Sequence, residues 1–111
     1  MNLIKDISTD VFEDEVMRSP IPVFIDFHAT WCGPCKAIMP MLEDVAREYE
    51  GEVRIVKIDI EAEPELATRF GIRAVPTFVL IHKGEEKERP RGILTRGNMS
   101  ALLEGYLEGG Q

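Results

Sequence analysis

The feature that most constrains the fold is a helix-forming stretch enclosed between two strand-forming runs. At residues 34–49 the apolar side chains recur with a period of about 3.6, which predicts an amphipathic helix with a broad buried face. Residues 23–27 are apolar on both faces, as in a central strand covered on two sides, and residues 53–60 alternate and are β-branched. A strand, a helix and a strand in this order predict a right-handed crossover, so at least two strands should be parallel.

Shorter elements are expected on both sides of this unit. They are a short strand, two short helices, a buried strand, a charged edge segment that contains a proline, and a last helix, at residues 3–7, 10–17, 64–70, 77–81, 86–92 and after Thr95. Pro40 should kink the long helix because it removes one backbone hydrogen bond, and Gly51 should terminate it in the left-handed conformation. Helices that alternate with strands in so short a chain predict an α/β fold with helices on both faces of the sheet.

The composition limits the function. A chain of 111 residues, 44% of them hydrophobic, can bury a sufficient core without cross-links, and two cysteines are too few for a disulfide scaffold. The formal net charge of -7 argues against nucleic acid, which requires a positive face. No stretch approaches the ~18 apolar residues of a membrane span, and the N-terminal residues do not resemble a secretory signal. We therefore expect a cytoplasmic protein without nucleic-acid or membrane partners, with residues 1–108 as a single domain and residues 109–111 as a disordered tail.

The two cysteines lie together where the first predicted strand meets the long helix, in the sequence Trp31-Cys32-Gly33-Pro34-Cys35-Lys36. Residues three positions apart in a first helical turn are about 5 to 6 Å apart, which suits a reversible disulfide. Cys32 at the helix N-terminus is the natural nucleophile, because free backbone N–H groups favour its thiolate. Cys35 should be more shielded and should resolve a mixed disulfide, while Pro34 fixes the helix start and Gly33 leaves the approach open.

Two other interpretations of the cysteines are weaker. Buried inert cysteines are common in intracellular chains, but the Cys-x-x-Cys spacing after the strand of a strand-helix-strand unit is typical of a redox motif. A structural zinc site needs four ligands, and only His28, Cys32 and Cys35 lie close together in the sequence. We therefore expect no metal.

Segments outside the cysteine motif also follow a known pattern. In chain order they are Phe24-Ile25-Asp26-Phe27, Pro40, Val56-Lys57-Ile58-Asp59, Phe70-Gly71-Ile72-Arg73-Ala74-Val75-Pro76-Thr77-Phe78, Gly84 and Gly92. Together with the motif they resemble the thioredoxin family over residues 3 to 107. The resemblance implies a three-layer fold in which four helices flank a mixed five-stranded sheet. It also implies a monomeric protein-disulfide reductase with no bound cofactor, whose redox-active disulfide carries electrons from a thioredoxin reductase to disulfide-containing substrate proteins.

The resemblance assigns further roles by position. Asp26 is similar to a buried carboxylate that exchanges a proton with Cys35, and Lys57 is similar to a lysine beside it. A lone Asp in an apolar strand should have a raised pKa, which suits a proton acceptor; the alternative is a hydrogen-bonded structural Asp. The substrate-binding surface that the family implies comprises Trp31, Gly33, Pro34, Val75, Pro76 in a cis peptide, and Gly92. For the tryptophan, the alternative is an ordinary packed aromatic.

Two positions depart from the family pattern. His28 stands where the family usually has a large aromatic residue; a titratable group there would alter the redox poise of the cysteines, although a packing substitute is the favoured interpretation. Arg89 and Arg91 would share one face of the edge strand and favour acidic partners, although charges on edge strands more often serve to prevent aggregation.

Two rival functions stay open at this point. One is a disulfide oxidase or isomerase of an oxidising compartment. The Gly-Pro dipeptide between the cysteines argues against it, because it resembles the reducing members of the family. The other is a binding or scaffolding module of the same fold, which would hold a partner through the surface around Trp31, Pro76 and Gly92 with incidental thiols.

Overall fold

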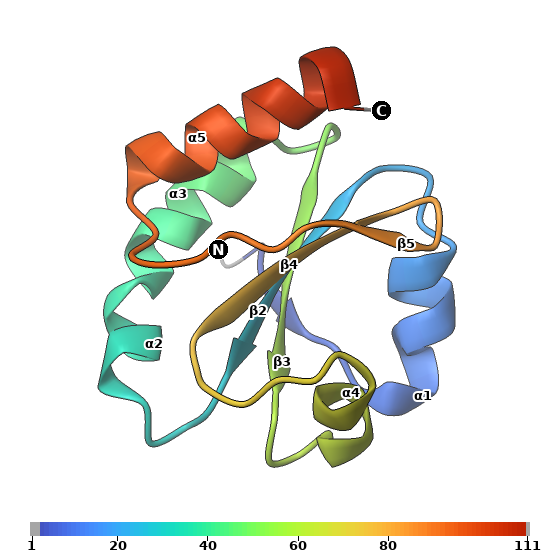
Figure 1. Ribbon diagram of the computed structural model, residues 1–111, viewed down its shortest axis with the longest axis vertical. Coiled ribbons are helices and arrows are strands. Elements are labelled where there is room, and N and C mark those ends of the chain that lie inside the picture. Colours follow the sequence, from blue (N-terminus) through green and yellow to red (C-terminus); the bar gives the residue numbers. More distant parts are fainter. Residues whose placement is uncertain (1–2, 111) are drawn as a thin grey trace.

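The computed structural model describes residues 3–110, and at its centre is a five-stranded sheet (Figure 1). The strands are β1 (Lys5–Asp6), β2 (Val23–His28), β3 (Arg54–Asp59), β4 (Thr77–His82) and β5 (Glu85–Glu88). Their spatial order is β1-β3-β2-β4-β5, in which β1, β3 and β2 are parallel and β4 is antiparallel to both β2 and β5. The expected mixed sheet is confirmed, and β2 and β3 are the parallel strands of the predicted crossover.

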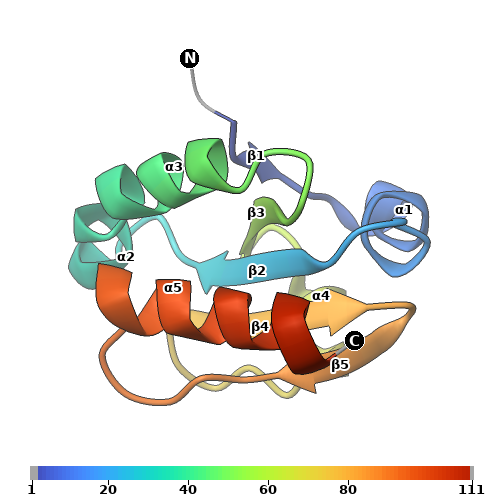
Figure 2. The same ribbon diagram turned by 90° about the horizontal axis from the view of Figure 1, so that it is seen from above.

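Helices cover both faces of this sheet (Figure 2). In chain order the helical segments are α1 (Thr9–Phe12) continued by a π-helical turn (Glu13–Met17), α2 (Gly33–Ala37), α3 (Met39–Glu48), α4 (Pro64–Arg69), and α5 (Arg96–Gly105) continued by a π-helical turn (Tyr106–Gly110). The helices α3 and α5 lie on one face, and α1 and α4 lie on the other. This arrangement is the layered α/β fold that the sequence predicts. Within residues 3–110 no helix has the length and apolarity needed to cross a membrane.

The kink expected at Pro40 takes the form of a break at Ile38, so residues 34–49 form two helices and not one. Pro40 lies in the first turn of α3, where an N–H group has no partner within the helix. The N–H of Ile38 donates to the carbonyl of Pro34 at 3.3 Å, and the carbonyl of Ile38 accepts from the N–H of Leu42 at 3.1 Å. Gly51 follows α3 with φ 90°, as expected of a left-handed terminator.

The structure differs from the sequence-based expectation at the C-terminus and at the sheet edge. Gly109 and Gly110, expected to belong to a disordered tail, continue the last helix as part of its π-helical turn, because extending an existing helix is far easier than starting one. Gln111 lies outside the described residues. β5 ends at Glu88, so Arg89 and Arg91 follow the edge strand and do not share one of its faces.

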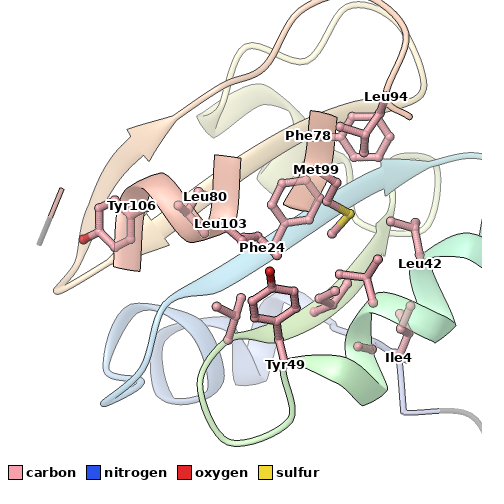
Figure 3. Packing of buried hydrophobic residues seen from close by; sticks show 14 residues of the cluster. Ile4, Phe24, Leu42, Tyr49, Phe78, Leu80, Leu94, Met99, Leu103 and Tyr106 are labelled. Atoms are coloured by element: carbon pink, nitrogen blue, oxygen red, sulfur yellow. The ribbon is translucent and has the colours of Figure 1, made fainter. Parts of the chain in front are cut away.

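The alternation of side chains along β2 decides on which face of the sheet Asp26 and His28 lie. Phe24 packs under α3 and α5, where its ring stacks on Phe78 at a centroid distance of 5.7 Å (Figure 3). Its neighbour Ile25 belongs to the cluster on the opposite face. Because successive side chains of a strand point to opposite faces, Asp26 and His28 project to the same side as Phe24. They therefore lie on the face of the sheet covered by the helices that follow the cysteine motif.

Candidate active site

Cys32 and Cys35 form a disulfide at the start of α2, directly after β2. Cys32 is the extended residue that caps the helix and Cys35 lies in the first turn, with 5.3 Å between the two Cα atoms. The backbone N–H of Cys35 donates to Sγ of Cys32 at 3.2 Å. In the reduced protein the same N–H is placed to stabilise negative charge on the Cys32 sulfur. The predicted pairing within a single helical turn is confirmed.

The disulfide does not hold the core together. The two large hydrophobic clusters that pack against the sheet contain neither cysteine. Cys32 and Cys35 are buried in a small separate cluster with Ala29, against which Val75 and Ile60 pack. The bond can therefore open and close while the packing of both sheet faces stays intact.

A cis peptide bond joins Val75 to Pro76, as the resemblance implied. Because Val75 packs against the cysteine cluster, this bond lies beside the disulfide. A groove of about 420 Å³ extends from it, lined by Pro34, Ala37, Ile38, Pro76, Phe78, Gly92, Ile93 and Leu94. The groove is mostly apolar and open to solvent, which suits an extended segment of another protein.

The groove unites only some of the residues expected to bind substrate. Pro34, Pro76 and Gly92 line it, whereas Trp31, Gly33 and Val75 do not. Trp31 is 64% exposed, so it is not a packed core aromatic. Ile93, which is 84% exposed in the groove, was not predicted from the sequence; the available signal was the apolar pair Ile93-Leu94 directly after Gly92, next to a charged segment. Gly92 itself has φ 82°, a conformation that favours glycine.

Asp26 is completely buried in β2, and neither of its carboxyl oxygens has a hydrogen-bond partner among the described residues. The structure therefore does not support the alternative that Asp26 is a structural residue held by hydrogen bonds. Burial raises the pKa of Asp26 from an ordinary 3.8 to about 6, although the positive charges of His28 and Lys57 oppose the shift. A carboxyl with this pKa can take up and release a proton close to neutral pH.

Lys57 is the register neighbour of Asp26 on β3, but its ammonium pairs with another residue. Nζ of Lys57 lies 3.7 Å from Oδ2 of Asp6 on β1. Oδ1 of Asp6 lies 2.9 Å from Nε2 of His28, whose side chain is only 14% exposed. Asp6 was not predicted from the sequence, since nothing in a two-residue edge strand indicates what its side chain contacts across the sheet.

The polar side chains around His28 line a cavity beside Cys35. Its volume is about 350 Å³, and its lining comprises Asp6, His28, Ala29, Thr30, Cys35, Lys36, Met39, Lys57 and Asp59. Within residues 3–110 no group of three or more His, Cys, Asp or Glu side chains is placed to hold a metal ion.

The two arginines after β5 differ in their surroundings. Arg89 is neutralised, because its guanidinium bonds the carboxylate of Glu86 at 2.8 Å and donates to the carbonyl of Phe70. Arg91 is exposed and lines a second groove of about 450 Å³, together with Arg73 and Pro76. Arg89 lines this groove as well, but Glu86 neutralises it, so the positive charge beside the cis-proline comes from Arg73 and Arg91 and not from the pair expected from the sequence.

A disulfide that spans one helical turn, stands outside the core and adjoins an exposed apolar groove is suited to exchange electrons with another protein. Together with the surrounding fold, it defines a thiol–disulfide oxidoreductase.

Comparisons with known proteins identify the family. The sequence model of the thioredoxin family matches residues 3–105. The chain is 33% identical to thioredoxin 1 of Nostoc sp. over 107 residues, which cover 96% of this chain and 100% of that protein. It is 39% identical over 101 residues to a thioredoxin of Acidithiobacillus ferridurans, covering 91% and 94%. It is also 35% identical over 104 residues to the chloroplastic M-type thioredoxin of Spinacia oleracea, covering 94% and 58%. The chain belongs to the thioredoxin family and has the activity of a thioredoxin disulfide reductase.

Proposed function

We propose that Cys32 begins each reaction by attacking the disulfide of a substrate protein. The Cys32 thiolate forms a mixed disulfide with one substrate sulfur, and the second substrate sulfur leaves as a thiolate that takes a proton from water. The observation that carries this assignment is the N–H of Cys35, which already donates to Sγ of Cys32. A thiolate at Sγ keeps that donor, so the attacking form needs no rearrangement of the helix.

The second step regenerates the disulfide. The thiol of Cys35 transfers its proton to the carboxylate of Asp26, and the resulting Cys35 thiolate attacks Sγ of Cys32. The remaining substrate sulfur leaves as a thiolate and is protonated, so two electrons and two protons have passed to the substrate. The unpartnered carboxyl oxygens of Asp26 support this role, because nothing else competes for the proton. Lys57, its register neighbour, favours the charged form of Asp26.

The substrate segment docks along the cis peptide. The Val75 backbone beside the disulfide offers hydrogen-bonding groups to an extended chain, which is a form of strand addition. Pro34, Pro76 and Gly92 supply the apolar floor of the groove, with Ile93 at its exposed end. Trp31 and Gly33 flank the entrance to the disulfide, where a bound partner would cover the indole.

The wider setting follows from the family and from the chain's composition. Electrons return to the disulfide from a thioredoxin reductase, so the protein needs no bound cofactor. Residues 1–108 act as a single thioredoxin domain, and the net charge of -7 keeps the molecule monomeric and in solution. A cytoplasmic location fits a disulfide reductase, because the cytoplasm keeps thiols reduced.

Trapping the mixed disulfide tests the assignment of the two cysteines. Cys35→Ser leaves the nucleophile but removes the resolving thiol, so it should accumulate a covalent adduct with a disulfide-containing protein such as insulin. Cys32→Ser is the matched control and should form no adduct. An adduct that forms through Cys35 in preference to Cys32 would reverse the roles.

The direction of electron flow is a separate question, which the reduction potential of the Cys32–Cys35 couple answers. A reductase should equilibrate near the value typical of thioredoxins, about -270 mV, whereas an oxidase would lie near -120 mV. A value at the oxidising end would overturn the reductase and favour the rival function in an oxidising compartment.

A further inference from the structure

Three strands place ionisable side chains side by side on the face of the sheet that carries the cysteines. Asp6 of β1 is the register partner of Lys57 of β3, and Lys57 is in turn the partner of Asp26 of β2. His28 lies two residues after Asp26 on the same strand, and therefore on the same face. Among the charges that act on Asp26, that of His28 has the largest effect, ahead of Lys57, which is consistent with this proximity.

Asp26 has no direct contact with solvent, although the cavity beside Cys35 is close. It is 0% exposed and is not part of the cavity lining. A proton taken from Cys35 must therefore pass through a lining group before it reaches water. The ionisable lining groups, from β1, β2, β3 and α2, are Asp6, His28, Cys35, Lys36, Lys57 and Asp59. Of these residue types, only histidine ordinarily changes its charge between pH 5 and 8.

Asp6 determines the tautomer of the His28 imidazole. The carboxylate oxygen Oδ1 of Asp6 can only accept, so at 2.9 Å the Nε2 of His28 carries the hydrogen. In the neutral ring this leaves Nδ1 as the nitrogen that takes up a proton. Lys57 holds Asp6 from the other side through Oδ2, at 3.7 Å.

Charged groups from three elements face the imidazole. Asp6 of β1 contacts it, and Asp59 of β3 is the register partner of His28. Lys57 of β3 and Lys36 of α2 line the same cavity. The Oδ1 of Asp59 is already engaged by two backbone N–H groups, so Asp6 is the carboxylate in direct contact with the ring.

We propose that His28 is the group through which the proton held by Asp26 returns to water, and that Asp6 is the positioning residue that sets its tautomer. The proton leaves the Asp26 carboxyl when a water molecule or a side-chain rotation bridges it to Nδ1 of His28, and passes from the imidazolium to water in the cavity. No electron moves in this step. The inference rests on the proposed role of Asp26.

Chemical rescue tests the proposal. His28→Ala opens space in the cavity, and should slow substrate reduction about tenfold near neutral pH over repeated turnovers, because Asp26 must lose its proton before it can accept the next one. This loss is smaller than the 10²–10⁴ of a general base, because cavity water still carries some protons. Free imidazole added at constant pH and ionic strength should restore most of the rate. His28→Phe is the matched control, which fills the space: it should be equally slow and not respond to imidazole.

Two further variants separate the possible failures. Asp6→Asn should lower the rate less than His28→Ala and should change the shape of the pH–rate profile, which a purely structural role would not do. If Asp26→Asn slows the same step while His28→Ala keeps the wild-type rate and pH profile, the role of His28 is overturned and that of Asp26 stands. If Asp26→Asn itself keeps the wild-type rate and pH profile, Asp26 is not the proton acceptor, and the proposed role of His28 is overturned as well. Equal rescue of His28→Ala and His28→Phe would also overturn the proposal.

Discussion

Two polar side chains are buried in the central strands of the sheet, at opposite ends. Asp26 in β2 is 0% exposed and His82 in β4 is 5% exposed. Val23 at the start of β2 pairs with Ile81, next to His82, whereas Asp26 lies toward the end of β2 that leads to the cysteines. Nδ1 of His82 and the hydroxyl of Tyr106 are joined by a hydrogen bond of 2.6 Å, whereas neither oxygen of Asp26 has a partner among the described residues.

This difference separates a structural role from a chemical one. A satisfied buried polar group helps to specify the packing around it, as His82 does for the last helix. An unsatisfied carboxyl lowers stability, and it is retained where its altered chemistry is used. Burial raises the pKa of Asp26 to about 6, and burial, assisted by the charges of Lys83 and Lys87, lowers the pKa of His82 so that its imidazole stays neutral.

The largest effect is expected at the unsatisfied group. The rise in the Asp26 pKa from 3.8 to about 6 corresponds to roughly 3 kcal/mol of lost stability when the group is ionised, at ~1.4 kcal/mol per unit. Asp26→Ala should therefore raise the free energy of unfolding at pH 8 by about 2 kcal/mol, after a small cavity cost. Denaturant titration measures this change, and the same variant should reduce disulfides more slowly.

The matched control is Asp26→Asn, which removes the charge but leaves a buried polar amide and should gain less stability. If Asp26→Ala is instead destabilised at pH 8, then the carboxylate has partners that the structure does not show, and the contrast with His82 disappears.

The satisfied group should respond in the opposite way. Tyr106→Phe removes the hydroxyl and leaves Nδ1 of His82 buried without a partner, which should cost about 1–3 kcal/mol of stability. Disulfide reduction should be unchanged, because Tyr106 packs with the distant core beside Leu103 (Figure 3). A loss of activity without a loss of stability would mean that the two ends of the sheet are not independent.

The two groups should also give opposite dependences of stability on pH. The folded protein binds a proton at Asp26 more tightly than the unfolded chain does, so this contribution to stability is present at low pH and is lost as the pH rises from about 4 to about 6. For His82 the folded protein binds the proton less tightly, so stability is lost as the pH falls below about 6.5. Across this range, the stability of Asp26→Ala should no longer show the loss with rising pH, and that of His82→Gln should no longer show the loss with falling pH. If the two variants have the same dependence of stability on pH, the assignment is refuted.

The smallest effect is expected at the surface, where charges are screened. Arg91→Glu should slow the reduction of acidic substrates by no more than about threefold at low salt, and leave neutral substrates unaffected. Lys83→Glu makes the same charge change in the hairpin before β5, away from the groove, and should have no such selectivity. Equal effects of the two variants would show that net charge, and not the groove, is responsible.

The sequence alone predicts most of the fold, because its strongest signals are local. The period of the apolar residues identifies β2, β3 and the helices between and after them, and the cysteine spacing identifies the redox pair. The break at Ile38 is harder to place, since Pro40 can be accommodated either by a kink or by a new helix start, and packing decides between them.

Contacts across the sheet could not be predicted from the sequence. The sequence indicates a buried Asp26, but not that Lys57 turns to Asp6 or that Asp6 also holds His28, because both contacts depend on the register of three strands. The neutralisation of Arg89 by Glu86 depends in the same way on where β5 ends. These pairings join residues that are far apart in the chain or that lie in irregular segments. The period of the apolar residues therefore does not predict them.

The most direct test of the contrast between the two ends of the sheet is a titration of the Asp26 side-chain carboxyl, followed by the NMR signal of its ¹³C-labelled carboxyl carbon in the oxidised protein. The structure predicts a midpoint at about pH 6, raised by burial without a hydrogen-bond partner. A midpoint near the ordinary aspartate value of about 4 would show that Asp26 is solvated or hydrogen-bonded, and would contradict its assignment as the proton acceptor.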